Sequence, residues 1–141
     1  MIKVMIDTNI IIDYLADRSP FADDAEKILD LCDQGEMTGA LTANSVTDIY
    51  YIMRKVAGRE KTLESLKLLF SVLEVASVGK TDLLRAMESP FPDFEDALCA
   101  MCAKRIKAEC IITRNTRDFQ SSHILPMTPK NFLERFFPGE V

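Results

Sequence analysis

The sequence predicts an α/β fold, specifically a three-layer α/β/α sandwich around a central parallel sheet of four to five strands. Short apolar runs recur along the 141 residues, and stretches with apolar residues at helical spacing separate them. Strands that alternate with helices favour parallel pairing through right-handed crossovers. No internal repeat or long linker divides the chain. We therefore expect a single domain over residues 1–141.

The first third of the chain is typical of one strand followed by two helices. Residues 3–6 form a short apolar run of the kind that becomes a buried strand. Residues 10–16 and 21–32 then place apolar side chains at helical spacing. Gly35 soon afterwards is a suitable end for the second helix.

The middle of the chain continues the same alternation. Residues 39–42 are expected to form the second strand. Asn44 or Ser45 can then cap a helix that runs to about residue 55. Residues 62–73 form a further amphipathic helix, and residues 75–78 form the third strand.

The last third adds three helices and two strands. Helices are expected over residues 81–88 and 93–108, with a Pro-containing break between them. Residues 110–113 form the fourth strand, and residues 124–125 form a brief fifth one. In the segment 128–136, the initial Thr can cap a last helix, and Pro suits its first turn.

Composition limits the possible functions. The net charge of −5 argues against non-specific nucleic-acid binding through overall charge. It is compatible with a nucleic-acid enzyme, because a bound metal offsets the charge of its carboxylate ligands locally. No apolar run approaches the roughly 20 residues of a membrane-spanning helix, and Asp7 comes too early for a signal peptide. A cytoplasmic location without membrane contact is expected.

The four cysteines are expected to be buried free thiols. Cys99 and Cys102 make a CxxC pair, but they lie in an apolar helical run with no second cysteine pair and no nearby His. Zinc binding or redox activity is the weaker alternative for this pair. Reduced thiols suit a cytosolic protein, where they act as small apolar side chains.

Acidic residues recur where strands end or helices begin. In a parallel α/β sheet these places share one edge, which is where ligands bind. Carboxylates far apart in the sequence can therefore meet there. The candidates are Asp7, Asp48, Asp93, Glu95, Asp96 and Asp118.

Such a carboxylate cluster favours a hard divalent cation such as Mg²⁺, which prefers oxygen ligands. Two such ions about 4 Å apart can activate water and stabilise the leaving oxygen in phosphodiester cleavage. The single His123 gives no evident nucleophile–base pair with a Ser or Cys in the sequence.

Helix capping is the alternative explanation for several of these acids. Ser45-x-x-Asp48 can be a capping box, and Asp93 can be an N-cap. Acids in a first helical turn are also favoured by the helix dipole. Asp7 fits capping least well, because a charge between two apolar runs is costly to bury unless it is paired or binds a metal.

Three motifs in order resemble those of the PIN domain family. Residues 4–9 (VMIDTN) resemble its opening strand, which ends in Asp followed by Thr or Ser. Residues 94–98 (FEDAL) resemble its third acidic motif, and residues 111–119 (IITRNTRDF) resemble its last one. Two positions depart from many members: Asp48 stands where Glu is common, and Asn115 stands where Asp is common.

The resemblance implies an α/β/α sandwich with Mg²⁺- or Mn²⁺-dependent ribonuclease activity. Many small bacterial members are toxins of type II toxin–antitoxin pairs. The implied partners are RNA, a cognate antitoxin that covers the acidic site, and a second copy of the chain in a homodimer.

Roles follow for the matching positions. Asp7, Asp96 and Asp118 are the predicted metal ligands, and Asp48 is predicted to be a further ligand or to orient the attacking water. Arg114 and Arg117 are predicted to bind RNA phosphates. The residues expected to position ligands or substrate are Thr8, Asn9, Asp93, Glu95, Thr113 and Asn115. Asn9 can equally cap the first helix.

Three other functions compete with a nuclease. A phosphotransferase of the haloacid dehalogenase type needs a second Asp two residues after the first, where Asn9 stands here. A PIN fold without catalysis could bind nucleic acid, as the Asp48 and Asn115 departures allow. A protein-interaction module that uses the apolar helices is the third alternative.

Overall fold

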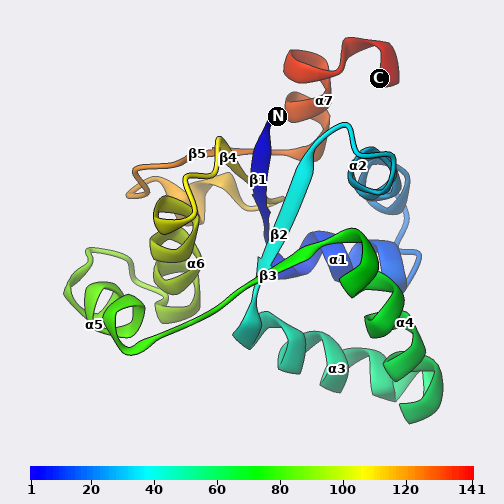
Figure 1. The fold of residues 1–141 in the computed structure, drawn as a ribbon, viewed down its shortest axis with the longest axis horizontal. Coiled ribbons are helices and arrows are strands. Elements are labelled where there is room, and N and C mark those ends of the chain that lie inside the picture. Colours follow the sequence, from blue (N-terminus) through cyan, green and yellow to red (C-terminus); the bar gives the residue numbers. More distant parts are fainter.

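The computed structural model describes residues 1–141, and its centre is a sheet of five strands that all run parallel (Figure 1). The strands lie side by side in the order β3-β2-β1-β4-β5. Their bounds are β1 Lys3–Ile6, β2 Thr38–Thr42, β3 Glu74–Ala76, β4 Cys110–Ile112 and β5 Leu125–Met127. The predicted parallel sheet of four to five strands is confirmed.

Seven α-helices flank the sheet on both faces. In Figure 1, α1 to α4 and α7 lie on one side of the strands, and α5 and α6 lie on the other. This arrangement confirms the predicted three-layer sandwich. The helices are α1 Thr8–Leu15, α2 Ala22–Asp33, α3 Ala43–Ala57, α4 Arg59–Val72, α5 Lys80–Glu88, α6 Phe94–Arg105 and α7 Pro129–Phe136. Two 3₁₀ turns, Thr116–Phe119 and Pro138–Glu140, complete the chain.

Side chains alternate between the two faces of the sheet, as the pleat of a strand requires. Val4 and Ile6 of β1 enter a core of 22 buried residues that joins the sheet to α1–α4 and α7. Met5, between them, enters a second core with Ile111 and the buried face of α6. The near-continuous apolar runs of the strands thus reflect burial on both faces.

Gly39 in β2 allows two helical segments to approach the sheet closely. A Cβ at this position would lie 2.7 Å from Cys32 Sγ and 2.7 Å from Leu73 Cδ2. Both distances are shorter than real Cβ contacts allow. The ends of α2 and α4 therefore pack against a strand position that has no side chain.

Two helix starts differ from the sequence prediction. The first helix begins at Thr8, and Asp7 is its N-cap and accepts the Thr8 N–H. The expectation that Asp7 fits capping least well is therefore wrong, because its carboxylate also satisfies the start of α1. Asn9 is therefore inside α1 and does not cap it. The third helix is preceded by Thr42 as N-cap, so neither Asn44 nor Ser45 caps it.

The predicted alternative of a capping box at residues 45 and 48 is wrong for the same reason. Ser45 lies in the first turn of α3, and its Oγ is hydrogen-bonded to Thr42 Oγ1 at 2.6 Å. Asp48 lies one turn further along the helix. Its carboxylate is thus not needed to satisfy the start of α3.

The remaining elements lie close to their predicted positions. The 93–108 helix is shorter than expected and ends at Arg105, and the turn Thr116–Phe119 was not anticipated. Thr128 caps α7 by accepting the Asn131 N–H, as predicted. All four cysteines are buried and free, which confirms the thiol prediction. No helix has the length and hydropathy needed to cross a bilayer.

Candidate functional site

Asp7 lies at the carboxyl end of the central strand β1 and is held there by two hydrogen bonds. Its Oδ1 accepts the Thr8 N–H at 2.8 Å, and its Oδ2 accepts the Thr113 hydroxyl at 2.7 Å. Thr113 follows the neighbouring strand β4 and is fully buried. The carboxylate orientation is therefore fixed by two separate strand ends.

A polar cavity of about 220 Å³ opens beside Asp7. The ends of β1, β2 and β4 contribute to its lining, as do α1, α3 and α6. Of the sequence-predicted residues, Asp7, Thr8, Asn9, Glu95, Asp96 and Asn115 line it. The structure thus brings together six positions that span more than a hundred residues of sequence.

Asp96 connects this cavity to a second one of about 380 Å³. The second cavity is lined by Asp93, Arg117 and Asp118, and Asp96 belongs to both linings. Asp93 caps α6 by accepting the Asp96 N–H at 2.9 Å, so its capping explanation is correct. This cap also fixes the backbone from which the Asp96 carboxylate extends.

Asp48 lies beside Glu95 rather than in the cavity lining. The pKa of Glu95 is raised by burial first, and then by the negative charges of Asp48 and Asp93. The carboxylates of α3 and α6 therefore face each other closely enough to repel. Asp48 therefore adjoins the acidic cluster through Glu95 and lines neither of the two cavities.

The charges of the central acids raise one another's pKa values. Burial raises the pKa of Asp7, while hydrogen bonds from Thr113 and Thr8 lower it and the charge of Asp118 raises it. The pKa of Asp96 is raised to about 7 by burial and then by the charges of Asp93, Asp7, Asp118 and Glu95. Such a displaced carboxyl pKa in a cavity is typical of functional sites.

The cavity lining includes residues that the sequence analysis did not assign to it. They are Ile12, Arg18, Thr42, Asn44, Ser45 and Cys99. Asn44 could have been found by the rule that identified Asp7, because it follows strand β2 by two residues. Burial raises the pKa of the Cys99 thiol well above its usual range, so the thiol remains protonated.

The donor atoms around the cavity fit a hard divalent cation. The carboxylates of Asp7, Glu95 and Asp96 supply oxygen, and the buried amide oxygens of Asn9 and Asn44 have no hydrogen-bond partner. Mg²⁺ and Mn²⁺ prefer such oxygen ligands. As the side chains stand, no three acidic, His or Cys groups are arranged to hold one metal ion directly. Mg²⁺ commonly binds through one or two carboxylates and retained waters.

The two arginines predicted to bind RNA occupy different surroundings. Arg117 lies beside Asp118 in the second cavity. Arg114 forms an ion pair with the buried Asp13, with Nε 2.7 Å from Oδ2, and its guanidinium lies 4.1 Å from the centre of the Phe21 ring. The guanidinium of Arg114 is therefore engaged within the fold.

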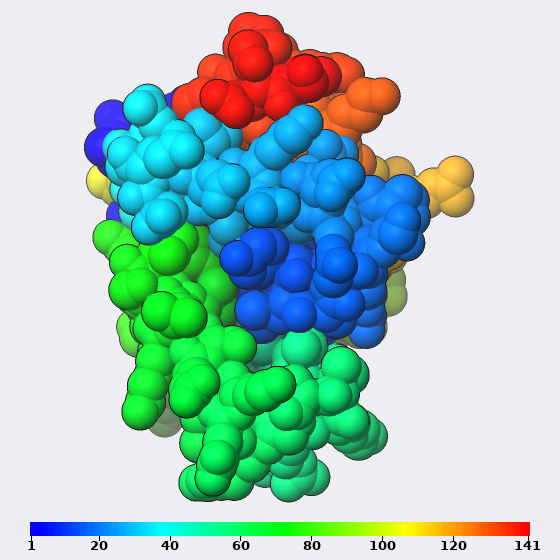
Figure 2. Space-filling model, turned by 90° about the vertical axis from the view of Figure 1, so that its right-hand side faces the viewer, coloured from blue at the N-terminus to red at the C-terminus, as the bar shows by residue number.

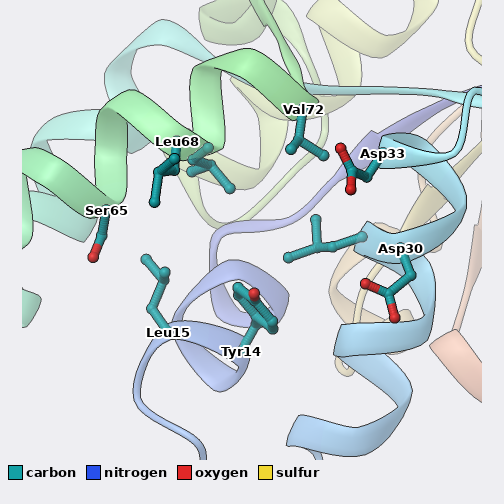
Figure 3. A pocket seen from close by; sticks show the side chains of 9 residues that line it. Tyr14, Leu15, Asp30, Asp33, Ser65, Leu68 and Val72 are labelled. Atoms are coloured by element: carbon teal, nitrogen blue, oxygen red, sulfur yellow. The ribbon is translucent and has the colours of Figure 1, made fainter.

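A separate, apolar groove of about 190 Å³ lies on another face of the molecule, between α1, α2 and α4 (Figure 3). Figure 2 shows this face, on which α1 is surrounded by α2, α3 and α4. Leu15 and Val72 point into the groove, while Asp30 and Asp33 lie at its α2 side. The groove offers no Lys or Arg for a phosphate, and it does not share residues with the acidic cavity.

The sequence and fold were compared with known proteins. A PIN domain family model matches residues 3–117. The chain is 28% identical over 142 residues to a protein named Ribonuclease VapC1 from Aquifex aeolicus, with 95% of each chain covered. Many solved structures share the fold at lower identity, and two of them illustrate the likeness.

The first of these is VapBC2 from Rickettsia felis bound to a promoter DNA fragment. It is 18% identical, with a TM-score of 0.71 over 90% of this chain and 98% of that one. The second is a toxin–antitoxin complex from Klebsiella pneumoniae, 21% identical, with a TM-score of 0.67 over 89% and 97%. With the family model matching most of its length and this architecture around its acidic cavity, the chain belongs to the PIN domain family.

Proposed function

We propose that this protein is a metal-dependent endoribonuclease that hydrolyses RNA phosphodiester bonds. One observation carries the proposal: acidic side chains from β1, α6 and the turn after β4 gather around adjoining cavities at the carboxyl edge of the sheet. Mutually repelling carboxylates are costly to place together, and a bound cation offsets that cost. Membership of the PIN domain family and the likeness to a protein named as a ribonuclease support the same function.

Asp7, Asp96 and Asp118 are the proposed ligands of Mg²⁺ or Mn²⁺, directly or through water. The bound ion would lower the pKa of water and stabilise the negative charge of the transition state. Hydrolysis forms a bond between a water oxygen and phosphorus and breaks a P–O bond to ribose. The oxygen-rich lining, with the unpaired amide oxygens of Asn9 and Asn44, supports this placement.

The chain's own side chains hold the reacting groups and their protons. Thr113 and Thr8 keep the Asp7 carboxylate directed at the cavity. Without a cation, burial and the neighbouring acids raise the pKa of Asp96 to about 7, so a bound metal ion would take the place of the proton that this carboxylate otherwise holds. Asp48 and Glu95 face each other at the edge of the cluster, where we propose that they orient water.

We further propose that the protein is the toxin of a type II toxin–antitoxin pair and that it forms a homodimer. Two of the proteins that share its fold are named as VapBC or toxin–antitoxin complexes, and this likeness supports the proposal. Co-expression with the product of a short adjacent reading frame, followed by co-purification, would test the antitoxin. The molar mass from light scattering would test the dimer, against a chain mass of 15.9 kDa.

The nuclease is tested by cleavage of a mixed RNA panel with Mn²⁺. The wild type is compared with Asp7→Asn and with Asp23→Asn, which alters an exposed acid on α2 away from the cavity. We expect cleavage by the wild type and Asp23→Asn, loss of cleavage in Asp7→Asn, and complete inhibition by EDTA. If none of the folded, antitoxin-free proteins cleaves any RNA, the chain is instead a non-catalytic PIN-fold binding module.

A further inference from the structure

Arg18 is the only Lys or Arg among the residues that line the acidic cavity. The other charged residues of the lining, Asp7, Glu95 and Asp96, are all acids. A polyanionic strand needs positive charge close to the reacting phosphate, in addition to any bound cation. The overall charge of the chain, −5, does not provide it.

The backbone of Arg18 is fixed in the loop between α1 and α2. Its N–H donates to the Asp13 carbonyl at 2.9 Å. Its own carbonyl accepts the N–H groups of Phe21 and Ala22, both at 2.8 Å. The side chain remains 46% exposed. Only the side chain therefore has to be ordered when a ligand binds, which limits the entropic cost.

The charge of Arg18 is not required by its single ionic partner. Asp13 is fully buried and already interacts with Arg114, through Nε at 2.7 Å and an Nη2 hydrogen bond at 3.2 Å. The Arg18 Nη1 lies 3.9 Å from Asp13 Oδ1, at the outer limit of an ion pair. One carboxylate thus has two cationic neighbours, and Arg114 alone can balance its charge. Arg18, which lines the cavity, therefore carries a positive charge that Asp13 does not need.

We infer that Arg18 binds a backbone phosphate of the RNA next to the cleaved bond. The inference rests on the proposed nuclease function, because it assigns a substrate contact to the same cavity. A guanidinium can donate two parallel N–H groups to phosphate oxygens, which holds the strand and its orientation. Arg114, which the sequence analysis favoured for this role, has its guanidinium bound to Asp13 and packed on Phe21.

Equilibrium binding of a short single-stranded RNA tests the inference without requiring cleavage. The binding is measured with Mg²⁺ in an Asp7→Asn background, to which Arg18→Ala, Arg18→Lys or Arg59→Ala is added. Arg59 is an exposed arginine at the start of α4 that lines neither the acidic cavity nor the one beside it, so it serves as the matched control. Thermal melting of each variant shows whether it is folded.

We expect Arg18→Ala to weaken binding about tenfold, which is the loss of one charge-assisted phosphate contact. The slope of log affinity against log salt should decrease by about 0.7 for a single strand. Arg18→Lys should retain the salt slope but lose part of the affinity, and Arg59→Ala should bind like the parent.

Equal binding by Arg18→Ala and Arg59→Ala would overturn the inference, and so would absence of RNA binding by the folded parent. A wrong nuclease proposal would be recognised by a different result, because the wild type would then cleave no RNA. In that case an Arg18-dependent binding slope would still support the RNA contact.

Discussion

The Thr113 hydroxyl donates a hydrogen bond of 2.7 Å to Asp7 Oδ2 and thereby joins the ends of the central strand β1 and its neighbour β4. Thr113 Oγ1 also accepts the N–H of Asn115 at 3.0 Å. One buried hydroxyl therefore sets both the orientation of the principal acid and the start of the turn that leads to Asp118. Thr113 thus holds the Asp7 carboxylate in place, and its role in positioning ligands or substrate stays a prediction.

We predict that Thr113→Val destabilises the protein by about 1 kcal/mol, because it leaves the Asn115 N–H and a partly buried Asp7 oxygen without their partner. The pKa of Asp7 should rise further, since the bond from Thr113 lowers it. Urea unfolding and Mn²⁺ titration measure the two effects. Thr81→Val, at an exposed position on α5, is the control. An unchanged Mn²⁺ affinity in folded Thr113→Val would show that this bond does not support the metal site.

The second prediction concerns pH. The folded-state pKa of Asp96 is about 7, against an ordinary value of 3.8, so the folded protein binds the proton more tightly than the unfolded chain does. The stability contributed by this proton is present below about pH 4 and is lost as the pH rises through 7. The metal-free wild type should therefore lose stability between pH 5 and pH 8 relative to Asp96→Asn.

Urea unfolding in EDTA at pH 5 and pH 8 checks this prediction. The Asp96→Asn variant should be more stable than the wild type at pH 8, and the difference should shrink at pH 5. Asp23→Asn, on the surface of α2, should follow the wild type at both values. A wild type whose stability relative to Asp96→Asn does not change with pH would contradict the coupling among these carboxylates.

The sequence alone was sufficient to identify the candidate site residues that lie directly after a strand or at the start of a helix. Asp7 was found because it directly follows an apolar strand, and Asp93 and Asp96 were found because they begin a helix. In a parallel sheet these places share one edge, so local pattern was enough to predict their convergence. The same rule applies to Asn44, because it lies shortly after β2. The sequence analysis instead interpreted Asn44 as a candidate N-cap of the following helix.

The sequence could not predict contacts that depend on long-range packing. Arg114 was assigned to phosphate because it follows β4, but its partner Asp13 lies 101 residues earlier on α1. Arg18 is in a loop, and no local pattern indicates that this loop returns to the cavity. Both contacts depend on where α1 and the loop after it lie relative to distant segments of the chain, which periodicity alone does not specify.

The third prediction follows from the burial of Asp13. Arg114→Met, which keeps most of the side-chain volume, should destabilise the protein by about 3 kcal/mol, because it leaves a buried carboxylate with only the distant Arg18 as partner. Adding Asp13→Asn should recover part of that loss, since the charge is then removed. Denaturant unfolding of the two single variants and the double variant gives the coupling. Simple additivity of the two changes would show that Asp13 and Arg114 do not stabilise each other.

The last prediction compares two acids whose charges act on different carboxylates of the site. The charge of Asp118 contributes to the raised pKa of both Asp7 and Asp96, whereas the charge of Asp48 contributes to that of Glu95. If Asp7 and Asp96 bind the metal ion, the charge of Asp118 also interacts with that ion. We therefore expect Asp118→Asn to reduce the rise in Tm caused by Mn²⁺ more than Asp48→Asn does.

The rise in Tm with Mn²⁺ reflects binding to the folded state alone and increases with the ratio of free metal to Kd. Melting curves over a series of Mn²⁺ concentrations, with Mg²⁺ in parallel, therefore rank the two variants directly. The metal-free Tm of Asp118→Asn should be at or above that of the wild type, because one of the repelling charges is removed. A larger loss of the Mn²⁺ response in Asp48→Asn would move the centre of the metal site towards α3 and Glu95.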